Sequence, residues 1–328
     1  MLDFIIKRIL IMIPTFIIIT IISFVIIELP PGDFLSTYVA ELQQGGQYVD
    51  QAELESLRVR YGLDQPAPVR YWRWISGILL RGDFGYSFGW ERPVSDLIWE
   101  RMGLTLVVSV SSLLFSWIVA FPIGIYSAVK QHTFTDYAIT FIGFLGLSIP
   151  NFMFALVLMF GSYMYLDLNV GGLFSPEFIR APWSWAKFVD MLQHLWIPMI
   201  VIGTAGTAGL IRIMRNNLLD ELEKPYVKTA RSKGLSYPKA ILKYPVRIAF
   251  IPFLSTAGWL LPQMISGEAI TAVVLSLPTT GPLLLRGLLD QDMYLAGSII
   301  LLTASLTLIG TLISDLLLAL ADPRIRYD

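Results

Sequence analysis

The chain has 328 residues, of which 55% are hydrophobic and only 15% are charged, and its formal net charge is −1. A soluble protein of this length exposes far more charge, so the composition predicts an integral membrane protein. The absence of cysteine excludes disulfides, thiolate metal sites and a cysteine nucleophile.

Apolar segments long enough to cross a bilayer recur along the chain, since a spanning helix needs about 20 residues. The first follows the charged residues 1–8 and is too long for a signal peptide, so we expect it to be retained. Six such segments are predicted, at residues 9–27, 105–129, 137–165, 195–214, 251–275 and 295–320. The expected fold class is an all-α membrane protein.

Basic residues predict the orientation of these segments, because Lys and Arg accumulate in short cytoplasmic loops. Lys7 and Arg8 precede the first segment and place the N-terminus inside. Six crossings then return the C-terminus to the inside, where Arg324 and Arg326 lie, and Lys130 falls in a short inner loop. Both termini are therefore expected in the cytoplasm.

The segment 29–102 is long and mixes charged, glycine and aromatic residues, with a helical pattern over residues 51–61. We expect a small, ordered external subdomain, followed by a five-helix core in residues 103–328, while residues 1–28 hold the N-terminal segment and first span. Tryptophans favour the membrane–water interface. They predict that this segment and the approach to the fourth span lie against the outer interface, through Trp72, Trp74, Trp90, Trp99, Trp183, Trp185 and Trp196.

The loop at residues 216–250 is strongly basic and is expected in the cytoplasm. Its pattern predicts two short helices: one that ends at Gly234, and one that Ser236 caps, with Pro238 in its first turn, and that Tyr244 ends. An ordinary topogenic loop would carry the same charge, but the ordered helix pair favours a docking surface. The basic residues are Lys224, Lys228, Arg231, Lys233, Lys239, Lys243 and Arg247.

Helix-weakening residues interrupt several predicted spans. Close packing through small residues is one explanation, and hinges beside a translocation path are the other. Packing is favoured except in the fifth span, where the breaks cluster. These residues are Pro122 and Gly124; Ser148 and Pro150; Gly203, Gly206 and Gly209; and Gly258, Pro262 and Gly267.

Ionisable residues within apolar segments are candidates for function. Glu268, near the outer end of the fifth span, either faces an aqueous cavity or is a hydrogen-bonded carboxylate at the interface, and both interpretations stay open. Asp315 is expected to pair with Arg212 or Arg215 at the inner end of span four. Glu28 is expected at the outer interface.

No pattern of catalytic residues is evident. His132 and His194 are far apart, and zinc motifs, a Ser-His-Asp arrangement and a phosphate-binding Gly-Lys-Ser/Thr loop are missing. A proton- or sodium-driven carrier needs acidic or histidine side chains deep in the membrane, and beyond Glu268 and Asp315 there are almost none. An energised transporter would therefore draw its energy from a partner protein that contacts the basic loop. Membrane lipid is expected around the spans, and no nucleic-acid partner is expected.

Short motifs occur in order along nearly the whole chain. They are LPPGD at 29–33, YGLDQP at 61–66, RY at 70–71, GDFGYS at 82–87, SIPNF at 148–152, YVKTARSKGL at 226–235 and DPRIR at 322–326. Together they resemble the permease of binding-protein-dependent ABC importers, in the dipeptide/oligopeptide/nickel class. The strongest piece, residues 226–235, looks like the coupling-helix motif of that family.

The resemblance implies a type I importer permease in a bacterial or archaeal plasma membrane. It would pair with a second, similar permease, two cytoplasmic ATPase subunits and an external solute-binding protein. This chain would bind no cofactor, since ATP and magnesium would sit on the ATPase subunits. The implied coupling residues are Tyr226, Lys228, Thr229, Ala230, Arg231, Gly234 and Leu235, and the implied translocation path or outer gate comprises Glu268, Pro278, Gly281 and Asp292.

Three positions depart from the family pattern. Ala272 stands where the family usually has glutamate, residues 278–281 read PTTG instead of PGLG, and Tyr244 replaces a histidine. The first two lie near the expected cargo exit, so a peptide cargo is favoured while oligosaccharides or other solutes stay open. Two other classes of protein are weaker alternatives: a self-contained channel or secondary carrier, and a membrane scaffold or receptor.

Overall fold

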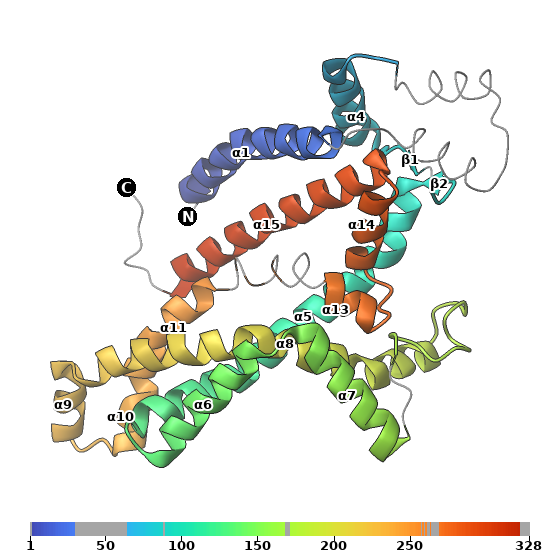
Figure 1. The fold of residues 1–328 in the computed structure, drawn as a ribbon. Helices are drawn as coiled ribbons and strands as arrows, with labels where there is room; N and C mark the ends of the chain where they lie inside the picture. Colours follow the sequence, from blue (N-terminus) through green and yellow to red (C-terminus); the bar gives the residue numbers. More distant parts are fainter. Residues whose placement is uncertain are drawn as a thin grey trace. The chain divides into compact units, whose positions relative to one another are not determined.

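The computed structural model describes residues 2–29, 64–87, 89–167, 171–256, 258, 260, 263 and 269–321. Apart from a two-stranded antiparallel ribbon, β1 (Tyr86–Ser87) with β2 (Arg92–Pro93), the elements in these ranges are helices (Figure 1). The chain forms two compact units: Met1–Leu104 with Thr279–Leu308, and Thr105–Pro278 with Ile309–Asp328.

Helices of membrane-spanning length and composition coincide with most of the predicted spans. In the described ranges there are four: α1 (Leu2–Glu28), α5 (Val94–Val129), α8 (Trp185–Leu222) and α15 (Met293–Ala321). A bent pair, α6 (Phe134–Ser148) with α7 (Asn151–Leu166), makes up to a fifth. The fold is therefore helical with four or five candidate spans.

The third predicted span, residues 137–165, is not one continuous helix, and it breaks at the helix-weakening residues Ser148 and Pro150. α6 and α7 meet at an angle of 101°. Ile149 is extended, with φ −90° and ψ 122°, because the ring of Pro150 disfavours helical backbone in the preceding residue. Pro150 also lacks an N–H, and its own carbonyl accepts the first hydrogen bonds of α7, from Met153 and Phe154.

The fifth predicted span, residues 251–275, is described at its ends and, between them, only at residues 258, 260 and 263. α11 (Pro245–Ser255) and α13 (Ala269–Val274) bracket it, and a continuous crossing there stays a prediction. Several sequence-based expectations lie outside the described residues. They are the helical pattern at 51–61, Pro262, Gly267, Glu268, Arg324 and Arg326.

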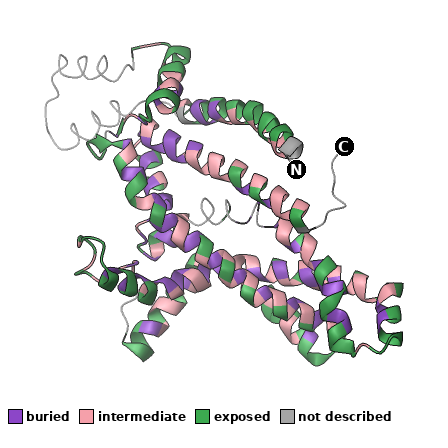
Figure 2. Cartoon of the chain, turned by 180° about the vertical axis from the view of Figure 1, so that it is seen from behind, coloured by how far each residue is buried: buried purple, intermediate pink, exposed green. Residues whose placement is uncertain are grey.

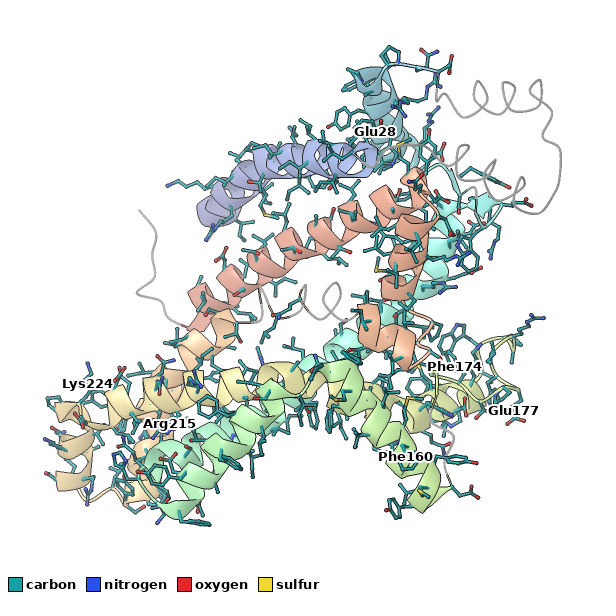
Figure 3. The ribbon with its side chains drawn as sticks, in the orientation of Figure 1. Glu28, Phe160, Phe174, Glu177, Arg215 and Lys224 are labelled. Atoms are coloured by element: carbon teal, nitrogen blue, oxygen red, sulfur yellow. The ribbon has the colours of Figure 1, made fainter. Side chains whose placement is uncertain are left out.

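The first unit has an aromatic core between α1 and α4 (Ala67–Arg81). The ring of Phe24 lies 5.4 Å from that of Tyr71 and 6.1 Å from that of Trp74. Trp74 is only 6% exposed and belongs to this core, whereas Trp72 is 70% exposed, and the place of this segment at the outer interface stays a prediction. Glu28, labelled in Figure 3, forms an ion pair with Arg70 of α4.

The second unit has its core where α5, α8 and α11 cross. A Cβ at Gly124 would lie 2.7 Å from the Met214 Cβ, and one at Gly203 would lie 2.6 Å from the Phe115 ring. These two glycines therefore allow close helix contact, which confirms the packing interpretation for them. Gly209 has no heavy atom within 4 Å of such a Cβ. Buried positions recur along α5 and α8. Figure 2 shows buried positions alternating with exposed ones along the long helices.

Candidate functional site

The basic loop begins where α8 ends, at Leu222, and turns into α9 (Pro225–Ser232). Pro225 occupies the first turn of α9, where its missing N–H costs nothing. The Tyr226 hydroxyl donates a hydrogen bond to Glu221 at 2.6 Å, which ties the new helix back to α8. Burial and this carboxylate raise the pKa of the Tyr226 hydroxyl, so it stays a neutral donor. Figure 3 shows Arg215 towards the end of α8 and Lys224 at the turn into α9.

The predicted end of α9 at Gly234 is confirmed. Gly234 has a φ of +88°, a left-handed conformation that glycine adopts at little cost. The Leu235 N–H reaches back to the Ala230 carbonyl at 3.3 Å and the Gly234 N–H to Arg231 at 2.9 Å. A Cβ at Gly234 would meet no heavy atom within 4 Å, so a side chain there would project into open space.

The second predicted short helix is α10 (Tyr237–Lys243). Pro238 lies in its first turn as expected, but Ser236 makes no side-chain capping bond, so that part of the prediction was wrong. Tyr244, with φ −116° and ψ −76°, separates α10 from α11, which begins at Pro245. The order of the two helices and their ends therefore follow from local signals.

A hollow lies on the surface between α9 and α10. We call it the loop hollow; its volume is ≈ 670 Å³ and it is lined by Lys228, Arg231, Ser232, Gly234, Leu235, Ser236 and Tyr237. The Arg231 guanidinium lies 5.2 Å from the centre of the Tyr237 ring, which links the two helices. Lys228, Thr229 and Arg231 are exposed. The surface is concave, basic and open to a partner.

Beneath the loop hollow, α10 is packed against the spans, and α9 lies against α10. Ile241 of α10 belongs to one buried cluster with Leu218 of α8 and Phe253 of α11. The Phe253 ring in turn lies 5.4 Å from Trp117 of α5. Because packed side chains resist compression, a displacement of α9 and α10 would be passed to α5, α8 and α11.

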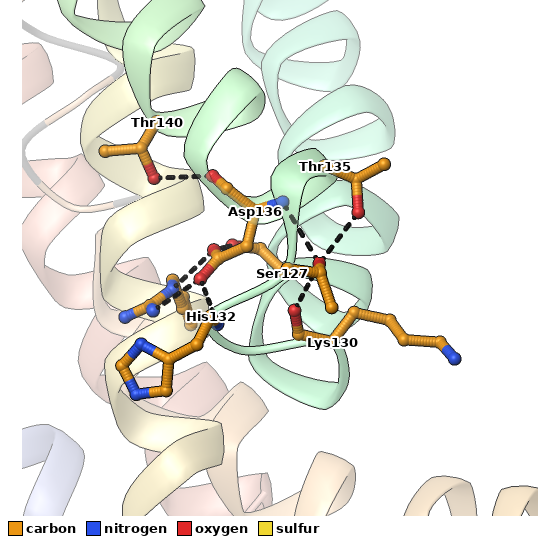
Figure 4. Close-up of polar contacts among 8 residues, drawn as sticks. Ser127, Lys130, His132, Thr135, Asp136 and Thr140 are labelled. Atoms are coloured by element: carbon orange, nitrogen blue, oxygen red, sulfur yellow. Dashed lines mark hydrogen bonds and ion pairs between the residues drawn. The ribbon is translucent and has the colours of Figure 1, made fainter.

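A second polar cluster joins three helices at the start of α6 (Figure 4). The Asp136 carboxylate accepts two hydrogen bonds from the Arg215 guanidinium, at 2.9 and 3.0 Å. It also accepts from the Ser127 hydroxyl and from the backbone N–H of His132. Asp136 is 2% exposed, and it ties α6 to α5 and α8.

Sequence reasoning did not select Asp136, although Thr133, three residues earlier, caps α6 by accepting from the Asp136 N–H. Thr-x-x-Asp before an apolar run is a recognisable start signal for a helix. The prediction that Asp315 pairs with Arg212 or Arg215 was wrong. Arg215 forms an ion pair with Asp136, and the Arg212 guanidinium lies 5.0 Å from the centre of the Phe144 ring.

The residues of the predicted translocation path are described in part. Glu268 lies outside the described residues, Pro278 is half-buried, and Gly281 is buried in α14 (Thr280–Leu289). Asp292 is 1% exposed and accepts hydrogen bonds from the Ser87 hydroxyl at 2.5 Å and the Leu295 N–H at 3.1 Å. Asp292 thus caps the start of α15 and fastens it to β1.

Metal chemistry finds no support in the described ranges, which hold no group of three or more His, Cys, Asp or Glu side chains placed to bind an ion. The sites built by these residues are surfaces and helix junctions. They suit mechanical contact better than covalent chemistry.

Known proteins of one class match this chain over nearly its whole length. Residues 120–327 match the family described as "Binding-protein-dependent transport system inner membrane component", and residues 1–109 match the N-terminal membrane component of the same systems. The oligopeptide transport system permease AppB of Bacillus subtilis is 34% identical over 99% of both chains. The dipeptide permease DppB of Escherichia coli is 29% identical over 100% of this chain and 99% of its own length. The oligopeptide permease OppB of Haemophilus influenzae is 30% identical over 100% of both. This chain therefore belongs to the family of inner membrane components of binding-protein-dependent transport systems, and is a multi-pass permease of the inner membrane.

Proposed function

We propose that the chain is one permease subunit of an ATP-driven importer for peptides that an external binding protein delivers. The observation that carries this is the helix pair α9–α10, which is exposed and basic at the loop hollow, and whose second helix is packed through Ile241 into the core of the spans. The peptide cargo is supported by relatives whose names specify oligopeptide and dipeptide transport. Oligosaccharides remain the second candidate cargo, because the pattern at residues 278–281 departs from the family near the exit.

In this proposal the chain crosses the membrane six times with both termini and the loop 216–250 in the cytoplasm, and residues 29–102 form an external subdomain. The basic residues of the loop support this orientation. A second, similar permease would complete the translocation path. Two ATPase subunits, which bind ATP and magnesium, would dock on the permeases, one on the loop hollow of each.

Tyr226, Lys228, Thr229, Ala230, Arg231, Gly234 and Leu235 would form the coupling surface. Closure of the ATPases would move α9 and α10, and the packed cluster around Ile241 would pass this motion to α5, α8 and α11. Glu268, Pro278 and Gly281 would line the path or the outer gate. Asp292 would act there by fixing the start of α15.

The proposal is tested by uptake into liposomes that contain this chain, its partner permease and the ATPases, with the binding protein outside and ATP inside. ATP-dependent accumulation of a labelled peptide library is expected, and no accumulation of a labelled maltodextrin mixture. Uptake of the maltodextrins alone would select the oligosaccharide alternative. Uptake by this chain alone without ATP would contradict the importer and favour a self-contained carrier.

Reversing two charges of the loop hollow, Lys228→Glu with Arg231→Glu, is expected to weaken ATPase association by about tenfold or more, because charged pairs at an interface control both encounter and retention. The measurement is a pull-down of the ATPase by the tagged permease over a range of ATPase concentrations. The matched control is Lys224→Glu with Lys239→Glu, which changes the same charge in the same loop outside the hollow. Equal binding of the ATPase by both double variants would mean that Lys228 and Arg231 only set the topology of the loop.

A further inference from the structure

A groove separate from the loop hollow lies between α6 and α8. Its volume is ≈ 450 Å³. One end is polar and is formed by His132, Arg212 and Asn216, and the other is apolar, with Phe144, Leu147 and Ala208. A polar end that opens into an apolar channel is suited to an amphipathic ligand.

The polar end carries a net positive charge. Among the residues that line the groove, Asp136 is the one acid, and Arg215 neutralises it through two hydrogen bonds. Asp136 also accepts from Ser127 and His132, so its carboxylate is turned into the protein. The Arg212 guanidinium is exposed and lies 5.0 Å from the Phe144 ring, which orients it without neutralising it. The groove therefore attracts an anion at Arg212.

The surroundings of the groove favour a lipid over a soluble anion. α6 belongs to the bent pair of membrane-spanning composition, and its outer positions are exposed and apolar: Phe141 is 65% exposed, Ile142 66% and Leu145 46%. In the isolated chain these side chains are uncovered, so acyl chains in a membrane have access to them. Basic pockets between membrane helices bind anionic headgroups, and arginine matches a phosphate with two parallel hydrogen bonds.

We propose that one anionic phospholipid occupies the α6–α8 groove, with its phosphate on Arg212 and the start of an acyl chain along Phe144 and Leu147. The lipid bridges α6 to α8, the helix that continues into α9. A ligand that binds the folded chain raises its thermal stability by mass action. The site is separate from the transport function, and its test does not depend on the cargo.

The test is a titration of the full-length chain in detergent with phosphatidylglycerol, followed by native mass spectrometry and thermal unfolding. One lipid is expected to remain bound and to raise the Tm, whereas phosphatidylcholine does so far more weakly. Arg212→Gln is expected to weaken phosphatidylglycerol binding about fivefold to tenfold, because one arginine near an anionic surface contributes that much. The control Arg180→Gln, which removes an exposed charge from an external loop, is expected to leave binding unchanged.

A second variant tests the groove itself. A Cβ at Gly143 would lie 3.6 Å from the Ala208 Cβ, which is ordinary contact, so Gly143→Ala fits, whereas Gly143→Leu fills the groove and is expected to displace the lipid. Gly161→Leu, in open space on α7, controls for the added leucine. Equal lipid binding by Gly143→Leu and Gly161→Leu would overturn the proposal. So would competition by inorganic phosphate at the same affinity, which would identify a soluble anion, or loss of the lipid when the partner permease is added, which would identify a protein contact.

Discussion

Gly234→Asp is expected to leave the chain inserted in the membrane but to reduce ATP-coupled uptake to less than about a tenth. Gly234 has a φ of +88°, so any other residue costs about 1–2 kcal/mol there, which is too little to unfold the chain. The new carboxylate would stand in open space at the edge of the loop hollow, beside Lys228 and Arg231. It would neutralise the basic surface and obstruct the partner that docks on it.

The measurement compares uptake and permease-stimulated ATP hydrolysis at matched membrane levels. Gly234→Ala introduces the backbone strain alone and is expected to keep most of the activity. Gly82→Asp is the matched control for charge and strain, because Gly82 also has a positive φ, +65°, and no heavy atom within 4 Å of a Cβ, at the end of α4. Normal coupling of ATP hydrolysis to uptake in Gly234→Asp would show that the loop hollow is not part of the surface on which the ATPase docks.

The loop helices could be predicted because local residues determine them. Pro225 and Pro238 each lie in the first turn of a helix, and Gly234 and Tyr244 each follow the end of one. These effects act within a few residues of the chain, so they can be read without knowing the fold. The presence of the long apolar helices could be predicted from the thickness of the bilayer, but α5 and α8, with 36 and 38 residues, extend beyond the predicted spans.

Contacts between distant segments could not be predicted in the same way. Arg215 lies 79 residues from Asp136, and Asp315 alone was expected from the sequence to be its partner. The choice depends on the crossing of α6 and α8, which apolar composition does not specify. Trp74 was assigned to the interface by its residue type, but the register of α4 on α1 turns it into the core.

The bend between α6 and α7 shows an intermediate case. Ser148 and Pro150 marked a weak point in the sequence, and the break occurs there. Proline explains why the helix stops, but the angle of 101° depends on how α7 packs afterwards against α8 and α13. The position of a break is therefore a local property, while its angle is a tertiary one.

Asp136→Asn is expected to lower the Tm of the detergent-solubilised chain by about 5–10 °C. Removing one partner of a buried ion pair costs about 3–5 kcal/mol, because the other charge is left without compensation. Asp136 is 2% exposed and accepts from three residues, one on α5, one in the turn before α6 and one on α8, so asparagine, which has one acceptor oxygen, cannot satisfy them all. The measurement is size-exclusion chromatography after heating. Asp220→Asn, at an exposed position on α8, is the control and is expected to shift the Tm little.

The double variant Asp136→Asn with Arg215→Gln separates the ion pair from the other contacts of Asp136. Since it removes the uncompensated guanidinium charge, its loss of Tm is expected to be smaller than the sum of the two single losses. The remaining loss would come from the Ser127 hydroxyl and the His132 N–H, which both donate to the carboxylate. Strictly additive losses would show that Asp136 and Arg215 act independently. The junction of α5, α6 and α8 would then depend on apolar packing, such as the close approach of Gly124 to Met214, instead of on this pair.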